Sequence, residues 1–501
     1  MRNLLYALAA ATLIAAAPAP KAPPPPSDAP PDAVTQHAIV LGGQTYPYTA
    51  RAGTIAIEND KGETTARMFY TAFTVDGANP RTRPVTFLYN GGPGSSTIWL
   101  RMGSFGPVRA QVGDAAPTPG APFNLVDNQY SLLDRTDLVF VDAPDTGFSR
   151  IVPPGKPSDF FGADPDVRAF AQFVSRYIST FGRWNSPKFL FGESYGTPRS
   201  AMLVNSLQRQ GIGINGVVLL SSVLDFSLDW SINFSPTAIG GGDWAFPLYL
   251  PTEAAASWYH HALPGAQTTL DALLPQVEGF AMNEYLNALA QGSKLSPDTY
   301  NDVVAKLHQY TGLSENYIRQ SNLRIPYWRY TTELFRDSGV MLGRYDARYT
   351  SYNLDRLADR ADFDAVDSAI DAAFVATGNL YMRQVLGYQT TLVYRPITSL
   401  FRQWDWRHNG GLPLNTAQDL ASAMVFNPNL KVFSANGYYD FATPFWATVY
   451  TLNHLTIPSQ LQQNISYGFY ESGHMVYLHP DALARLHADL EAWYASTLGG
   501  R

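Results

Sequence analysis

Short apolar runs rich in β-branched and aromatic residues alternate with amphipathic helical stretches through the first half of the chain. Several runs are continuously apolar, as strands buried on both faces are. The clearest helical stretch is 164–181, where apolar residues recur at steps of three and four. The predicted strands are 54–57, 66–73, 85–90, 138–142, 189–191 and 217–221. This alternation predicts an α/β fold with a mostly parallel central sheet flanked by helices.

The pattern changes at about residue 229. From there to residue 387 the chain has helix-like stretches at 296–310 and 327–336, many aromatic residues and no clear strand. Strand patterns return at 431–434 and 465–469, and an amphipathic helix that starts near Pro480 ends the chain. We therefore expect a helical cap inserted into one core. The expected segments are core at 37–228, cap at 229–387 and core again at 388–501.

The N-terminal segment has the pattern of an export signal. A charged start at Arg2 is followed by an apolar stretch over 4–17 and by small residues suited to cleavage. The apolar stretch is short for a membrane anchor, so we expect a signal peptide at 1–19 and no stable membrane span. Residues 20–36 are rich in proline, which predicts a disordered tether. An exported protein, periplasmic or extracellular, is the expectation.

Composition narrows the possible partners. The chain has 501 residues, a net charge of −7 and 15% charged residues, which argues against nucleic acid as a partner. It has no cysteine, so packing rather than disulfides must stabilise it outside the cell. At this length a full hydrophobic core is expected. The sequence does not determine the oligomeric state.

The pentapeptide GESYG at 192–196 follows the apolar run 188–191 and fits a sharp strand-to-helix turn. Such a turn raises a serine hydroxyl above the sheet, so Ser194 is the candidate nucleophile. Glycines on both sides fit a turn with no room for a Cβ. The motif alone also occurs in ordinary turns, and the preceding strand is what favours the catalytic interpretation.

A serine nucleophile needs a base and a carboxylate that orients the base. Asp440 and His474 each follow a predicted strand, in the order serine, acid, histidine that this fold uses. Each residue alone could be an ordinary loop residue; the order of the three makes the interpretation stronger. His474 and His479 do not have the spacing of a metal-binding helix, so we assign no metal and no cofactor.

A glycine-rich segment, NGGPGSS at 90–96, follows the strand predicted at 85–90. This fold places an oxyanion-hole amide there, and the Gly92 amide is the candidate. The Tyr195 amide, at a helix N-terminus beside the nucleophile, is the candidate second donor. A simple glycine turn is the alternative interpretation.

These motifs together resemble the serine carboxypeptidase family. The resemblance is carried by NGGPG at 90–94, GFS at 147–149, GESYG at 192–196, Asp440-Phe441 and Gly473-His474-Met475. The cap segments YLPT at 249–252 and NLR at 322–324 are similar to bacterial members. The resemblance implies an α/β-hydrolase fold and removal of single residues from the free C-terminus of a peptide through an acyl-enzyme.

The resemblance also implies roles for individual residues. They are the triad Ser194, Asp440 and His474, the oxyanion-hole amides of Gly92 and Tyr195, and the carboxylate-binding groups Asn90, Gly91 and Glu193. A charged Glu193 would repel the substrate carboxylate, so it must be protonated, and peptide binding should weaken as the pH rises. Esters and amides without a free carboxylate should tolerate a higher pH.

Two positions depart from the family pattern. Ser95 stands where the family has a cysteine, in keeping with the absence of disulfides. Ser104 stands where many members carry a second glutamate that supports the carboxylate-binding one, which questions the acid preference of Glu193.

Two other functions fit parts of the sequence. An esterase or acyltransferase would use the same triad with a different acceptor, and Asn90 with Glu193 favours the carboxypeptidase. A catalytically idle binding protein would be expected to lack a triad member, whereas all three are present.

Overall fold

The computed structural model describes residues 30–228, 242–265 and 268–499 of the chain. The expected signal peptide and most of the expected tether lie outside these ranges. The end of the tether is corrected: strand β1 (Ala33–Leu41) already pairs with β2, so the expected tether at 20–36 stops before residue 33. The pattern of β1 is hard to recognise because Thr35 and His37 lie on its inner face, while Val34 is 47% exposed.

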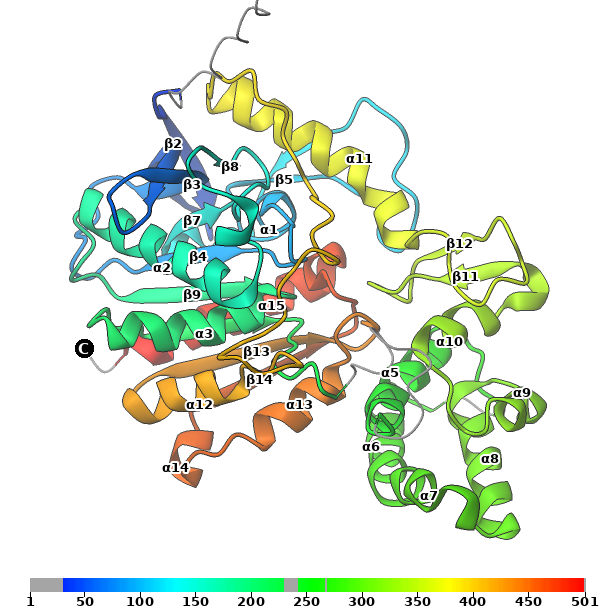
Figure 1. The fold of residues 1–501 in the computed structure, drawn as a ribbon. Coiled ribbons are helices and arrows are strands. Elements are labelled where there is room, and N and C mark those ends of the chain that lie inside the picture. The colour runs from blue at the N-terminus through cyan, green and yellow to red at the C-terminus, as the bar shows by residue number, and fades with distance from the viewer. Residues whose placement is uncertain (1–29, 229–241, 266–267, 500–501) are drawn as a thin grey trace, which may run out of the picture.

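The core is built around one large sheet, whose strands are antiparallel at one edge and parallel in the rest (Figure 1). Strands β1 to β3 and β7 pair antiparallel, whereas β7, β4, β9, β10, β13 and β14 pair parallel in that order. A short strand, β8, adds to β3. The further bounds are β2 Gln44–Glu58, β3 Thr64–Val75, β4 Val85–Tyr89, β7 Asp137–Val141, β8 Arg150–Ile151, β9 Lys188–Glu193, β10 Gly216–Leu220, β13 Lys431–Gly437 and β14 Ile465–Tyr470. The predicted α/β fold with a mostly parallel sheet is confirmed.

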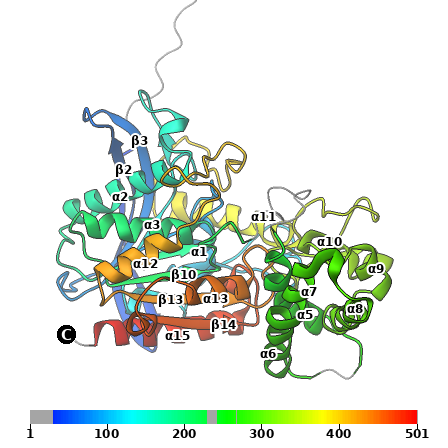
Figure 2. The ribbon, with the colours of Figure 1, turned by 60° about the horizontal axis from the view of Figure 1, so that its bottom comes forward.

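Helices cover both faces of this sheet (Figure 2). One apolar cluster joins the sheet to α2, α3 and α12, and another joins the opposite face to α1, α11 and α15. Strands such as β4, β9 and β10 are buried along their whole length, which explains their continuous apolar sequence. The helix bounds are α1 Ile98–Gly103, α2 Ala163–Thr180, α3 Gly196–Arg209, α11 Ala365–Leu380, α12 Ala417–Phe426, α13 Phe445–Asn453, α14 Ser459–Gln462 and α15 Pro480–Leu498.

The segment expected as a cap forms a helical layer beside the carboxyl end of the sheet, with its own apolar cluster (Figure 1). Its helices are α5 Ala245–Tyr259, α6 Leu270–Phe280, α7 Leu286–Gln291, α8 Pro297–Thr311, α9 Glu315–Gln320 and α10 Tyr327–Glu333. The absence of strands was a wrong expectation, because β11 (Val340–Leu342) and β12 (Thr350–Tyr352) form a small hairpin. Three-residue strands are too short for a readable alternating pattern.

Two segments link this layer to the core. Backbone hydrogen bonds join Ala347 N to Tyr439 O and Phe441 N to Arg344 O, at 3.0 and 2.9 Å. Helix α11, which lies in the range expected as cap, packs on α1 and shares the core cluster. The cap is therefore hydrogen-bonded to the loop that carries Asp440. A second hairpin, β5 (Val108–Ala110) with β6 (Leu125–Asp127), follows α1.

No helix in the described parts of the chain is long and apolar enough to cross a bilayer.

Candidate active site

Ser194 occupies the sharp turn between β9 and α3, with a backbone φ of 60°. The flanking glycines are required by space as well as by turn geometry. A Cβ on Gly192 would lie 2.0 Å from the carbonyl oxygen of Gly196, and one on Gly196 would lie 2.8 Å from that of Tyr89. The expected strand, turn and helix are thus present, and the serine is partly exposed at the top of the turn.

Asp440 and His474 come together although 34 residues separate them. They lie in the loops after β13 and β14, and His474 Nδ1 is 2.7 Å from Asp440 Oδ2. Both side chains are buried. Burial alone would lower the pKa of His474, but the charge and hydrogen bond of Asp440 outweigh it, and the pKa is raised. The imidazole is therefore well placed to accept and hold a proton on its other nitrogen, Nε2.

Asp440 is itself held by its own loop. Its Oδ1 accepts hydrogen bonds from the amides of Ala442 and Thr443, at 2.7 and 3.1 Å, and its Oδ2 accepts one from the Thr443 hydroxyl at 2.7 Å. The same hydroxyl is 3.2 Å from His474 Nδ1. Sequence reasoning missed Thr443. Its place three residues after the aspartate, in a tight turn, was the only available signal.

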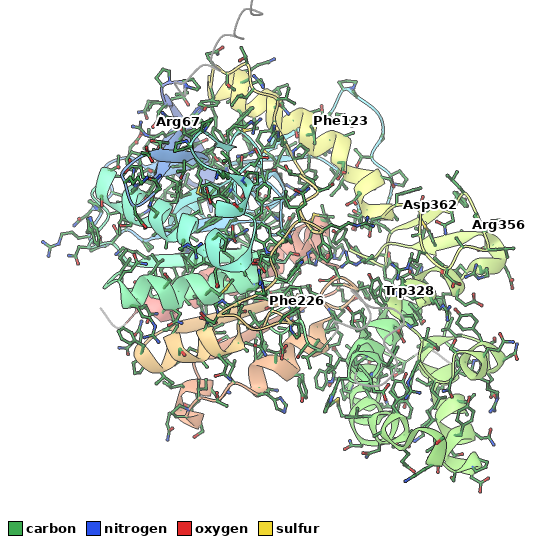
Figure 3. All side chains as sticks on the ribbon, in the orientation of Figure 1. Arg67, Phe123, Phe226, Trp328, Arg356 and Asp362 are labelled. Atoms are coloured by element: carbon green, nitrogen blue, oxygen red, sulfur yellow. The ribbon has the colours of Figure 1, made fainter. Side chains whose placement is uncertain are left out.

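A cavity of about 350 Å³ brings the remaining candidates together. Its lining includes Ser194, Tyr195, His474, Asn90, Gly91, Gly92 and Glu193, while Asp440 lies behind the imidazole. Phe226, which Figure 3 labels where core and cap meet, also lines this cavity. The cap contributes Arg344 and Tyr345, and the ring of Tyr345 lies 5.2 Å from that of His474. No sequence motif indicated these two residues.

The backbone around Gly91 and Gly92 lies directly against the start of α3. A Cβ on Gly91 would lie 2.3 Å from the amide nitrogen of Tyr195, and Gly92 has a φ of 100°. This close approach places the glycine loop and the Tyr195 amide side by side at the rim of the cavity. Such an arrangement suits the binding of an oxyanion between two backbone amides.

Asn90 and Glu193 form a buried hydrogen-bonded pair in the same cavity. Asn90 Nδ2 donates to Glu193 Oε1 at 2.8 Å, and Asn90 Oδ1 accepts from the Leu100 amide at 3.1 Å. Burial raises the pKa of Glu193 to about 7, against the opposing effects of His474, Tyr477 and Asn90. A neutral carboxyl that can donate a hydrogen bond is therefore available at acid pH without a second glutamate. Ser104, at the departing position, donates instead to the Leu100 carbonyl at 2.6 Å.

A third wall of the cavity was not expected. Residues 388–416, here named the closing loop, contribute Ile397 to Phe401 and Trp406 to the lining. Backbone bonds from Ser96 N to Pro396 O (2.9 Å) and from Thr398 N to Gly94 O (2.7 Å) attach this loop to the glycine loop. Trp404 Nε1 donates to the Tyr195 hydroxyl at 3.0 Å.

Among the described residues, one group has the proximity of metal ligands: Asp134, His487 and Glu491, whose ligand atoms lie within 4.8 Å of one another. Arg135 already binds Glu491 at 2.6 Å and Asp134 at 3.2 Å. The guanidinium of Arg135 already pairs with both carboxylates, so they have little charge left to bind a metal ion. These three residues also do not line the candidate cavity.

A parallel sheet with a serine at the strand-to-helix turn, and an aspartate–histidine pair on the following strand ends, defines the α/β-hydrolase class. The family model that describes the serine carboxypeptidases matches residues 43–267. A solved prohormone-processing carboxypeptidase from Saccharomyces cerevisiae superposes with a TM-score of 0.55 over 89% of this chain and 91% of that one. At 14% identity, this likeness concerns the fold.

Curated relatives match part of the chain. Serine carboxypeptidase-like 45 of Arabidopsis thaliana is 26% identical over 192 residues, which is 36% of this chain and 38% of that protein. Carboxypeptidase Y homolog A of Pyricularia oryzae is 24% identical over 289 residues, covering 55% of this chain and 47% of that protein. The chain thus spans about half, or less, of the length of these relatives.

Proposed function

We propose that this protein is a serine-type carboxypeptidase that releases the C-terminal residue of peptides through an acyl-enzyme. The observation that carries the proposal is one cavity that holds Ser194 and His474 together with the Asn90–Glu193 pair. The first two supply a nucleophile and base, and the pair supplies donors for a terminal carboxylate. The match of residues 43–267 to the serine carboxypeptidase family supports the same activity.

In this proposal, Ser194 Oγ attacks the carbonyl carbon of the last peptide bond while His474 Nε2 takes its proton. The Gly92 and Tyr195 amides stabilise the negative oxygen of the tetrahedral intermediate. When the intermediate collapses, His474 returns the proton to the nitrogen of the leaving amino acid. Water then attacks the acyl-enzyme, with His474 again as the base, and releases the shortened peptide. Asp440 keeps the imidazole in the required orientation throughout.

Recognition of the free C-terminus is the role of Asn90, the Gly91 amide and a protonated Glu193. Because the pKa of Glu193 is about 7, its carboxyl is neutral in acid and charged above neutral pH. A charged Glu193 repels the substrate carboxylate, so peptide binding weakens as the pH rises.

The decisive experiment uses one peptide in two forms, with a free and with an amidated C-terminus, analysed by mass spectrometry. The wild type is expected to shorten the free form stepwise at acid pH and to cleave the blocked form poorly, whereas Ser194→Ala cleaves neither. Equal cleavage of both forms at acid pH would contradict carboxypeptidase specificity. Fast cleavage of esters with no cleavage of free peptides would favour the second candidate, an esterase or acyltransferase with the same triad.

We also propose that the protein is exported to the periplasm or the extracellular space and belongs to the bacterial branch of the family. The support is the signal-like pattern at 1–19 and the cap segments at 249–252 and 322–324. N-terminal sequencing of the mature protein tests export. A mature N-terminus at or before residue 10 would contradict cleavage near residue 19.

A further inference from the structure

Helix α11 places two aspartates in the wall of the candidate cavity. Asp367 and Asp371 are four residues apart, so they lie on one face of the helix, and both line the cavity. Both side chains are half-buried. Neither has a role in the triad, the oxyanion hole or the carboxylate-binding pair described above.

These two carboxylates lack the partners that such groups usually have. Within the described residues, neither makes a hydrogen bond or an ion pair, and Asp371 Oδ1 is fully buried without a partner. Asp364, at the start of the same helix, shows the contrast, because it accepts three backbone hydrogen bonds, from Val366, Arg344 and Tyr345. A carboxylate withdrawn from water without a partner is costly, and such groups are characteristic of binding sites.

Contacts of helix α11 connect the region of Asp371 with the site proposed for the C-terminal residue of the substrate. Phe374, one turn further along α11, packs on Trp99 with ring centroids 5.4 Å apart. Trp99 lines the cavity and precedes Leu100, whose amide binds Asn90. Through these contacts Trp99 connects helix α11, which carries Asp371, with the segment that holds Asn90, and Trp99 offers an aromatic surface in the same cavity. Asp367 lies one turn earlier; burial, followed by the charges of Asp364 and Asp371, raises its pKa to about 8, with Arg344 and His474 opposing.

We propose that Asp371, with support from Asp367, forms a subsite for a positively charged side chain on the C-terminal residue of the substrate. This inference rests on the proposed carboxypeptidase function. A lysine or arginine side chain would lay its methylene groups along Trp99 and bring its cation to Asp371. The substrate class is then peptides that end in lysine or arginine.

The charges around the subsite predict a pH dependence. The groups that face Asp371 and Asp367 are Asp364 and each other on α11, Arg344 from the cap and His474 from the core. Burial, followed by the charge of Asp364, raises the pKa of Asp371 to about 6. The carboxyl is therefore neutral in strong acid and charged above about pH 6, so the preference for a basic residue should increase from pH 5 to pH 7.

The test compares two peptides that differ only at the C-terminus, one ending in lysine and one in norleucine, which has the same chain length without the ammonium. The readout is the ratio of their kcat/KM values, lysine over norleucine. We expect the wild type to favour lysine and Asp371→Asn to lower the ratio about tenfold, as for the loss of one ion pair in a partly buried site. Asp371→Glu should retain most of the ratio. Asp302→Asn, which removes one charge from an exposed position on α8, is the matched control and should leave the ratio unchanged.

The outcomes separate this inference from the function on which it rests. Cleavage of both peptides with a ratio that Asp371→Asn does not change overturns the subsite and leaves the carboxypeptidase proposal standing. An Asp371→Asn effect that appears only with lysine at the penultimate position overturns the assignment to the leaving residue. If the wild type cleaves neither peptide, the proposed function fails and the subsite fails with it.

Discussion

Asp440 is the residue on which the orientation of His474 depends, because its Oδ2 is 2.7 Å from the imidazole Nδ1. Replacement by asparagine keeps the shape but removes the charge that favours the required tautomer and the protonated imidazole. We expect Asp440→Asn to lower kcat by about 10³- to 10⁴-fold with little change in KM. Steady-state kinetics on a free peptide, with circular dichroism to monitor folding, measures this. A loss below about tenfold would contradict the assigned role.

Thr443 offers a graded test of the same pair. Its hydroxyl bonds Asp440 Oδ2 at 2.7 Å and lies 3.2 Å from His474 Nδ1. A hydrogen bond to a charged group is worth about 1.5–3 kcal/mol. Thr443→Val is therefore expected to lower kcat about tenfold or more, and Thr443→Ser, which keeps the hydroxyl, should retain most of the wild-type kcat. An equal loss in both variants would show that the hydroxyl alone does not account for the effect.

Glu193 is proposed to determine how the binding of peptides responds to pH. Its pKa, raised to about 7 by burial, means that the donor form predominates in acid and disappears as the pH passes 7. The wild-type KM for a free peptide should rise by about tenfold per pH unit above this value. Glu193→Gln keeps a neutral donor at every pH, so its KM should stay nearly flat from about pH 5 to pH 8. KM profiles of the two proteins that rise in parallel would show that another group controls binding.

At the scale of elements, the meeting of the glycine loop with the start of α3 depends on Gly91. A Cβ there would lie 2.3 Å from the Tyr195 amide nitrogen, so the two backbones must separate to admit it. Because the proposed oxyanion hole lies between them, Gly91→Ala should lower kcat at least about 100-fold. Gly213→Ala is the matched control, since nothing lies within 4 Å of a Cβ added there. Comparable activity of the two variants would place the oxyanion donors elsewhere.

A buried ion pair holds the helices that support this loop. Arg199 of α3 binds Asp166 of α2 at 2.6 Å and donates to the Asn90 carbonyl at 2.7 Å, with both side chains almost fully buried. Removal of one partner leaves a buried charge uncompensated, which typically costs about 3–5 kcal/mol. Asp166→Asn should lower the free energy of unfolding by that amount in urea titrations. The double variant Asp166→Leu with Arg199→Met should lose less than the single one, and a larger loss would contradict this explanation.

The elements that the sequence predicted correctly are those whose structure is determined by neighbouring residues in the chain. Buried strands such as β9 and β10 are apolar along their whole length, and the turn at Ser194 is marked by its flanking glycines, so both could be predicted. Arg344 and Asp371 could not be, because distant segments bring them to the same cavity, and the only signal for Thr443 was its place three residues after Asp440. Strand β1 was missed because its inward positions include polar residues.

At the scale of the whole molecule, the candidate site is assembled from three bodies. The sheet supplies the proposed nucleophile, acid and base, the cap segment supplies Arg344, Tyr345 and the face of α11, and the closing loop supplies the third wall. The sequence predicted the first two as separate layers, but the packing of α11 on the core depends on tertiary contacts with α1 that no local pattern encodes. The closing loop has little regular structure and gave no periodic signal at all.

His408 attaches the closing loop to the core. Its Nδ1 is 2.5 Å from Asp164 of α2 and its Nε2 is 2.8 Å from Asp419 of α12, with Arg168 and Arg209 beside the same surface cavity. Hydrogen bonding to Asp419 raises the pKa of His408 to about 9, with burial opposing and Asp164 adding to the effect. Since the pKa is higher in the folded state, this contact stabilises fully below about pH 6.5 and its contribution is lost as the pH rises through about 9.

Comparison of the wild type with His408→Gln isolates this contribution, because glutamine keeps a neutral hydrogen-bond donor without a titrating charge. We expect the wild type to be more stable by about 1 kcal/mol near pH 6, a figure reduced for partial exposure, and the difference to vanish near pH 9.5. Urea unfolding at both pH values measures it. Because the closing loop also holds the Tyr195 hydroxyl through Trp404, His408→Gln should raise KM at pH 6 more than at pH 9.5. A stability difference that is constant across this range would show that His408 contributes packing rather than charge.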